Sequence, residues 1–228
     1  INTLMKHKIL KGYDDFSVDR MVFANPIKDK HARAIEEPET MNLIKAKAED
    51  APVQVPPANS SAETRMELQK MIADIANVEG GKRAKKVAKY DEDILWAFEK
   101  YCKKHDLEYN KKFFEQLIDD SSFVIIKLKY KYNRPRPFQL APVLGLKLDA
   151  AEAKTAGSPS FPSGHAVQSQ LVADVLSKIY PVHHGAFQAI AEKINYSRYI
   201  GGLHFPNDIE YGNTIGEWLA IHSNTSSY

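Results

Sequence analysis

Beyond residue 60, apolar side chains recur at intervals of three and four residues, the spacing that predicts amphipathic helices. No stretch shows the two-residue alternation of a half-buried strand, and no internal repeat is present. The pattern predicts six helices, over about 60–79, 82–105, 110–132, 163–180 and 185–200, with the last one opening at Pro206. The chain is therefore expected to be all-α, a bundle of packed helices.

Residues at the helix boundaries support this assignment. Ser60 with Glu63 reads as a capping box at the first helix start, and Gly80-Gly81 as its end. Pro135 disfavours helix at the residue before it, so the third helix should stop near residue 133. Pro206 is suited to the first position of the last helix.

Two parts of the chain lack a helical period. Residues 1–57 hold several prolines and scattered charges, and we interpret them as an irregular N-terminal extension with short helical turns. Residues 58–228 form the predicted helical domain. Within it, the stretch 139–161 is expected to be a loop. The extension is a candidate surface for a partner or for a second copy of the chain.

Composition narrows the class of protein. Hydrophobic residues make up 43% and charged residues 26% of the 228, and the formal net charge is only +2. This balance gives no global attraction to nucleic acid or to an anionic membrane. Cys102 is the only cysteine, so no internal disulfide can form, and we expect it in the core.

No apolar run approaches the ~18 residues that span a bilayer, so an integral membrane protein is not expected. The first residues lack the apolar core of a signal peptide, and the compartment stays unassigned. A chain from which a signal peptide had been removed would be periplasmic.

Three short segments carry the candidate chemistry. They are Lys129-Tyr-Lys-Tyr-Asn-Arg134-Pro-Arg136-Pro137, then Pro162-Ser163-Gly164-His165, then Ser197-Arg198 followed by His204 and Asp208. Each alone has a simpler explanation: a basic helix end, a serine-capped helix start, or a core histidine before an N-terminal helix aspartate. Together they supply cations, two histidines and a carboxylate, which suits binding a tetrahedral oxyanion.

The chemistry of the second and third segments is specific. Ser163 and Gly164 open a helix, whose free N–H groups and partial positive charge bind anions. Asp208 lies four residues after His204, where it can accept a hydrogen bond from the imidazole and fix its tautomer. Arginine side chains bind phosphate-like oxygens in bidentate fashion, and lysine acts as a point charge.

The order and spacing of these segments, Lys-x6-Arg-Pro, Pro-Ser-Gly-His and Ser-Arg-x5-His-x3-Asp, resemble the three-part signature of the type 2 phosphatidic acid phosphatase superfamily. That superfamily includes soluble bacterial acid phosphatases and vanadium haloperoxidases. Lys129 with Arg136 satisfies the first motif, and so does Lys127 with Arg134. We prefer the first pair, because Arg134-Pro-Arg136-Pro-Phe138 is similar to a string found in soluble acid phosphatases. Lys127 and Arg134 are kept as accessory candidates.

The resemblance implies the all-α fold of that superfamily and a metal-independent hydrolysis of phosphomonoesters. In that mechanism His204 forms a phosphohistidine, Asp208 orients it, and His165 protonates the leaving alcohol. The phosphate oxygens would be held by five residues, Lys129, Arg136, Ser163, Gly164 and Arg198.

Two alternatives remain open at this point. In a vanadium-dependent haloperoxidase, His204 would bind vanadate, the one cofactor the motifs suggest. The length of this chain favours a phosphatase, because haloperoxidases of this superfamily tend to be much larger. The third reading is a structural or interaction protein on the same fold, against which the complete catalytic set argues. Substrate identity cannot be read from the motifs.

Overall fold

The computed structural model describes residues 15–38 and 40–228, and these form the all-α bundle that the sequence predicted. The helices, with their bounds, are α2 Asp15–Asp19, α3 Asp29–Glu36, α4 Ala62–Ala76, α5 Gly80–Asp91, α6 Leu95–Lys104, α7 Lys111–Tyr132, α8 Pro137–Val143, α9 Gly164–Ile179, α10 His184–Ile200 and α11 Pro206–Ile221, with the 3-10 turns η1 Ala48–Asp50 and η2 Pro181–His183. No named strand occurs among the described residues.

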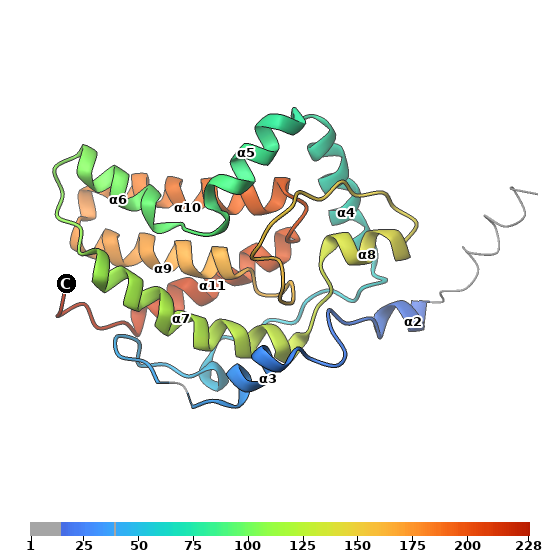
Figure 1. The fold of residues 1–228 in the computed structure, drawn as a ribbon, viewed down its shortest axis with the longest axis horizontal. Coiled ribbons are helices and arrows are strands. Elements are labelled where there is room, and N and C mark those ends of the chain that lie inside the picture. Colours follow the sequence, from blue (N-terminus) through green and yellow to red (C-terminus); the bar gives the residue numbers. More distant parts are fainter. Residues whose placement is uncertain (1–14, 39) are drawn as a thin grey trace, which may run out of the picture.

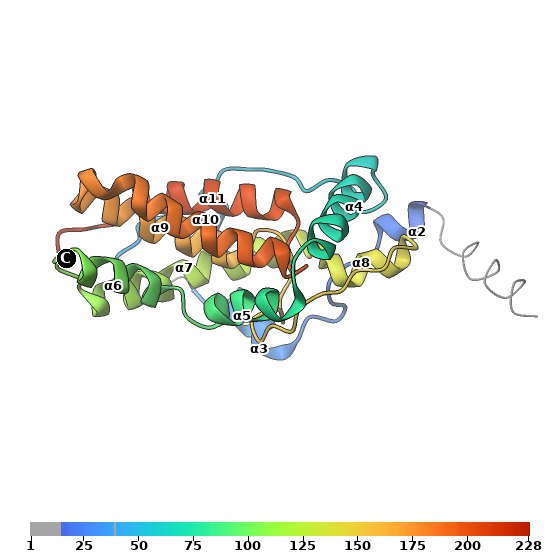
Figure 2. The same ribbon diagram turned by 90° about the horizontal axis from the view of Figure 1, so that it is seen from above.

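Four long helices lie along the long axis of the molecule (Figure 1). α9 is central and packs on both α10 and α11, while α7 lies against its remaining side. Figure 2 shows α4, α5 and α8 gathered at one end of this bundle. The core between the long helices is aromatic and aliphatic, with Phe98, Phe114, Phe161 and Phe187 completely buried, and Cys102 lies in it as expected.

The contact between α9 and α11 is unusually close because two glycines face α9. A Cβ on Gly212 would lie 2.7 Å from the Cβ of Ala166, and one on Gly216 would lie 2.6 Å from the carbonyl oxygen of Val167. The backbones therefore touch without side chains between them. At the site end of this contact, the N–H of Ser163 donates to the carbonyl of Asp208 at 2.9 Å.

Several predicted boundaries were wrong. The single helix expected over 82–105 is two helices, α5 and α6, with a break at which Asp93 caps the N–H of Leu95. Gly80-Gly81 begins α5 and does not end α4. The cap of α4 is Ser61, whose side chain accepts from Thr64 N–H.

One segment predicted to be a loop contains a helix, and the N-terminal extension contains short helices of the kind expected. The stretch expected to be a loop from residue 139 begins inside α8, which has Pro137 at its start. The N-terminal segment contains α2, α3 and η1, and its residues 1–14 and 39 lie outside the described part of the chain.

The N-terminal segment is fastened to the bundle at several points. Asp120 of α7 accepts the backbone N–H groups of Asn42, Leu43 and Ile44 with one carboxylate oxygen. Ile44 also forms an antiparallel bridge with Ser223, beyond the end of α11. The segment thus ties α7 to the far end of α11, and α3 lies along α7 (Figure 1).

Candidate active site

The three signature segments meet in one small pocket of about 160 Å³. It lies where the C-terminal part of α7, the start of α9 and the turn between α10 and α11 come together. The site residues that line it include Lys129, Arg136, Gly164, His165, Arg198 and His204. The long-range folding of the bundle thus joins residues up to 75 positions apart in the sequence, counted from Lys129 to His204.

His204 is buried, and both its ring nitrogens are engaged. Nδ1 lies 2.8 Å from the carbonyl oxygen of Ser160, which can only accept, so Nδ1 carries the proton. Nε2 lies 2.9 Å from Nη1 of Arg136, which can only donate, so Nε2 presents its lone pair. Burial, with Arg136 and Lys129 nearby, keeps the pKa of His204 well below its usual value despite Asp208. The ring is therefore neutral, with the unprotonated nitrogen toward the pocket cations.

Asp208 lies behind this ring and is completely buried. Its Oδ2 accepts from the hydroxyl of Ser160 and from Phe205 N–H, and is 3.5 Å from Nδ1 of His204. Its Oδ1 accepts from Nη1 of Arg134 at 2.7 Å. Burial would raise the pKa of Asp208, but Arg134 and the bonds from His204 and Ser160 hold it below its ordinary value. Ser160 therefore shares the orienting role that the sequence assigned to Asp208 alone.

Lys129 and Arg136 are buried basic residues whose partners are backbone carbonyls and, for Arg136, also Nε2 of His204. Nζ of Lys129 donates to Pro159 O, and Arg136 donates from Nε to Ser158 O at 2.8 Å and from Nη1 to Leu203 O at 2.9 Å. Burial lowers the pKa of Lys129, and lowers that of Arg136 to about 10. Within the described residues neither forms an ion pair with a carboxylate. Two desolvated positive charges without a counter-charge favour an anion in the pocket.

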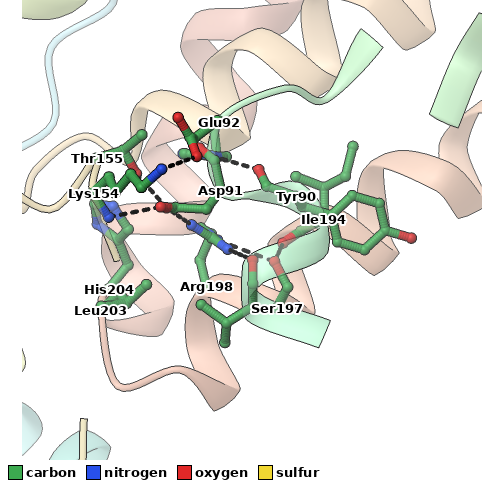
Figure 3. Close-up of polar contacts among 12 residues, drawn as sticks. Tyr90, Asp91, Glu92, Lys154, Thr155, Ile194, Ser197, Arg198, Leu203 and His204 are labelled. Carbon is green, nitrogen blue, oxygen red and sulfur yellow. Dashed lines mark hydrogen bonds and ion pairs between the residues drawn. The ribbon is translucent and has the colours of Figure 1, made fainter. Parts of the chain in front are cut away.

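Arg198, in contrast, has a partner that the sequence did not indicate. Its Nη1 donates to Oδ1 of Asp91 at 2.9 Å (Figure 3), and its Nη2 donates to Val87 O at 2.7 Å. The same carboxylate accepts from Lys154 N–H and from the Thr155 hydroxyl, which fixes the loop over the pocket (Figure 3). Asp91 closes α5, inside a lysine-rich stretch with no motif, so no sequence signal marked it.

His165 is held by the same end of α5. Its Nε2 lies 2.9 Å from the carbonyl oxygens of Tyr90 and Asp91, so Nε2 carries the proton and Nδ1 the lone pair. Burial and the charge of Arg198 lower the pKa of His165 to about 3, against the opposing effect of Asp91. In the absence of an anion His165 is therefore neutral.

Ser163 and Gly164 occupy the helix start that we predicted. The hydroxyl of Ser163 accepts from Ala166 N–H, and Gly164 lines the pocket. Ser163 is completely buried and is not part of the lining, so its side chain caps α9. The N–H groups of the first turn supply the partial positive charge at the pocket floor.

The two candidate pairs for the first motif are placed differently. Lys129 and Arg136 line the pocket, whereas Lys127 and Arg134 do not. Arg134 lies behind the pocket, with its guanidinium 4.1 Å above the ring of Phe205 and bonded to Asp208. It acts on the carboxylate and not on a ligand in the pocket.

Glu67 of α4 extends this buried network. Its Oε1 accepts from Asn207 N–H at 3.1 Å, and its Oε2 is 3.9 Å from Nη2 of Arg134. Burial, opposed by Arg134, raises the pKa of Glu67 to about 7. Two carboxylates thus share one arginine, and Asp208 takes the closer contact. The sequence analysis missed both Glu67 and Ser160.

Comparison with known proteins relates the chain to a protein family and to solved structures. Residues 120–227 match the PAP2 superfamily, a range that includes all three signature segments. The bundle is similar to the "crystal structure of the first bacterial vanadium dependant iodoperoxidase", with a TM-score of 0.55 and 18% sequence identity. The match covers 75% of this chain and 51% of that one, so the chain spans about half the length of that protein. No curated protein matches the sequence.

Two further findings concern the described residues. None of their helices is long and apolar enough to cross a bilayer. They contain no group of three or more His, Cys, Asp or Glu side chains arranged to hold a metal cation. The donor set of the pocket, which is cationic apart from two neutral imidazoles, fits an oxyanion such as phosphate or vanadate.

Proposed function

We propose that this chain, whose residues 120–227 belong to the PAP2 superfamily, is a phosphoric monoester hydrolase that works through a phosphohistidine at His204. The observation that carries the proposal is the unprotonated Nε2 of His204 among buried cations without carboxylate partners. A nucleophile with an available lone pair, surrounded by charge that a phosphoryl group would neutralise, is the arrangement that phosphoryl transfer needs.

In the first step, Nε2 of His204 attacks phosphorus and the P–O bond to the alcohol breaks, with its electron pair passing to the leaving oxygen. His165 supplies the proton that this oxygen takes up, so the alcohol leaves neutral. As Nε2 bonds to phosphorus, positive charge develops on the ring. The bond from Nδ1 to Ser160 and the carboxylate of Asp208 at 3.5 Å stabilise that charge.

The cations act while this happens. Lys129, Arg136 and Arg198, with the first N–H groups of α9, would bind the three non-bridging oxygens as their charge redistributes. Arg136 currently donates to Nε2, and a phosphoryl oxygen would take over that donor when the ester binds. In the second step water attacks the phosphohistidine, His165 accepts its proton, and the P–N bond breaks to release phosphate.

The protonation of His165 depends on the bound ester. The low pKa of His165 results from burial and from the nearby charge of Arg198, which Asp91 only partly opposes. A phosphate dianion beside Arg198 offsets that charge, which raises the pKa of His165 and lets it carry the proton. The ester therefore recruits its own general acid.

The test is turnover of a chromogenic phosphate ester between pH 4 and 8 in the presence of a chelator. We expect hydrolysis in wild type, and phosphorylation of His204 that mass spectrometry detects after acid-free quenching. His204→Ala should lose both and keep its helical circular dichroism. His222→Ala, an exposed histidine on the far side of α11, is the matched control and should retain both. No hydrolysis by wild type at any pH would refute the proposal.

The second candidate is a vanadium-dependent haloperoxidase. The same pocket favours it, because vanadate is a phosphate-like oxyanion that Nε2 of His204 could ligate while the three cations neutralise its oxygens. When bound, vanadate supplies the activation of peroxide for halide oxidation. Peroxide-dependent iodination or bromination that appears only on addition of vanadate, without ester hydrolysis in its absence, would favour this candidate over the phosphatase.

A further inference from the structure

The pocket around His204 is too small for a whole ester. Its volume of about 160 Å³ is below the roughly 300–1,000 Å³ of ordinary small-molecule sites. The phosphoryl group would fill it, since the cations and His204 surround that space. The alcohol part of a substrate must therefore lie in a neighbouring cavity.

A larger cavity of about 640 Å³ opens directly from this pocket. The two share four lining residues, Lys129, Ser158, Gly164 and Gln168. Gln168 lies one helical turn after His165 on α9, so both occupy one face of that helix. An ester passing from one space to the other would keep its bridging oxygen on the side of His165.

The walls of the larger cavity are largely apolar. α7 contributes Phe123, Ile125 and Ile126, and α3 contributes Ala34 and His31. Burial and three lysines, Lys30, Lys28 and Lys129, lower the pKa of His31, so its ring is neutral at pH 7. Asp119, Ser122 and Lys129 are the polar residues that α7 adds to this lining. An apolar group is the occupant that such walls favour.

α3 belongs to the N-terminal segment, outside the range that matches the family. It is held in place at the end of α7 that carries Lys129. His31 Nδ1 makes a short hydrogen bond with the hydroxyl of Tyr130, and the two rings are 5.3 Å apart. Just before α3, the N–H of Phe23 donates to Asn133 O at 2.8 Å. The wall that α3 forms is therefore attached to the helix that positions the phosphate-binding lysine.

We propose that this cavity binds the alcohol part of the substrate, and that α3 makes the enzyme selective for phosphomonoesters of aromatic or short aliphatic alcohols. The inference rests on the proposed hydrolase function and deepens it. It assigns to the N-terminal segment a direct part in substrate choice.

The test compares 1-naphthyl phosphate with glycerol 2-phosphate, which differ in the polarity of the alcohol. Wild type should show the higher kcat/KM for the naphthyl ester. Ala34→Trp fills the cavity and should lower kcat/KM for this ester by at least about tenfold, and by clearly less for glycerol 2-phosphate, whose polar alcohol gains little from apolar walls. Arg33→Trp adds the same side chain at an exposed position of α3 and should change neither value.

Ile126→Asn makes one wall polar without filling the space, and serves if Ala34→Trp does not fold. It should lower kcat/KM for the naphthyl ester by at least about tenfold as well. Equal kcat/KM for both esters in wild type, or equal losses for both in the variants, would overturn the inference and leave the hydrolase function standing.

If neither ester is hydrolysed, the hydrolase proposal fails and calorimetry tests the cavity separately. Wild type should bind 1-naphthyl phosphate more tightly than inorganic phosphate, and Ala34→Trp should remove that difference. Equal affinities for the two ligands in wild type would overturn the cavity assignment on its own.

Discussion

Replacing Asp91 by alanine would test the least expected part of the site. The carboxylate of Asp91 accepts three hydrogen bonds, from Arg198 Nη1 at 2.9 Å, from Lys154 N–H at 2.7 Å and from the Thr155 hydroxyl at 2.6 Å. Burial alone would raise the pKa of Asp91, but these bonds lower it below the ordinary value. The carboxylate is therefore charged at pH 7, and its removal changes the charge of the site.

The size of the effect follows from what is left behind. Lys154 is exposed, and water can take the place of the lost acceptor there. The side chain of Arg198 is only 1% exposed, so the variant would bury a guanidinium with no counter-charge. Removing one partner of a buried ion pair costs about 3–5 kcal/mol. That is a large share of the roughly 5–15 kcal/mol that stabilises a domain.

The assay is a double-mutant cycle of urea unfolding at pH 7 without added phosphate, with Asp91→Ala, Arg198→Met and the combined variant. The combined variant should be more stable than the sum of the single costs predicts, by at least about 1 kcal/mol. Costs that add to within about 0.5 kcal/mol would refute the coupling. The cost of Asp91→Ala should also shrink as the pH falls below 3.8, because the unfolded chain protonates Asp91 at a higher pH than the folded protein does.

Three further predictions concern the lysine of the first motif, the buried acid Glu67 and the contact between α9 and α11. Lys129→Ala should reduce ester turnover far more than Lys127→Ala, because only Lys129 of the two lines the pocket. The reverse order in steady-state assays would exclude the assignment of Lys129 to the first motif. The pKa of Glu67, raised from 4.5 to about 7, means that wild type loses stability as the pH rises through this interval. Glu67→Gln should lack that loss, which amounts to at most about 3 kcal/mol. If urea unfolding gives wild type and Glu67→Gln the same change in unfolding free energy between pH 5 and pH 8, this expectation is contradicted. Gly216→Ala should lower the free energy of unfolding by about 1–3 kcal/mol, because the added Cβ would lie 2.6 Å from a carbonyl oxygen of α9. The control Gly185→Ala, where a Cβ has nothing within 4 Å, should not destabilise the protein. Equal melting temperatures for the two variants would count against close packing of α9 and α11.

Periodicity predicted most of the helices because the signal is local. α7, α9, α10 and α11 lie where the apolar spacing and the flanking prolines and glycines indicated. α8 was missed because it has only seven residues, too few for a period. Its start at Pro137 was nonetheless visible, since proline favours the first helical position.

The site shows where local reasoning ends. Lys127 and Lys129 are two residues apart, about 200° around a helix, so only the packing of α7 decides which one faces the pocket. The spacing rules say nothing about Asp91 or Ser160, because their roles arise from contacts across 107 and 44 residues of sequence. The motifs thus identify most of the charged groups that line the pocket, and the supporting groups behind them appear only in three dimensions.

The glycine contact between α9 and α11 holds one side of the pocket differently from the side opposite it. His165 and His204 are borne by segments whose backbones touch and whose ends are joined by the Ser163–Asp208 bond. The opposite rim, 154–160, is fastened mainly by side chains that reach its backbone, those of Asp91, Lys129 and Arg136. Side-chain hydrogen bonds of this kind can break one at a time, whereas two helices packed backbone to backbone must separate as a whole. We therefore expect the motions that admit an ester and release phosphate to occur mainly at the rim, and the distance between the two histidines to change less.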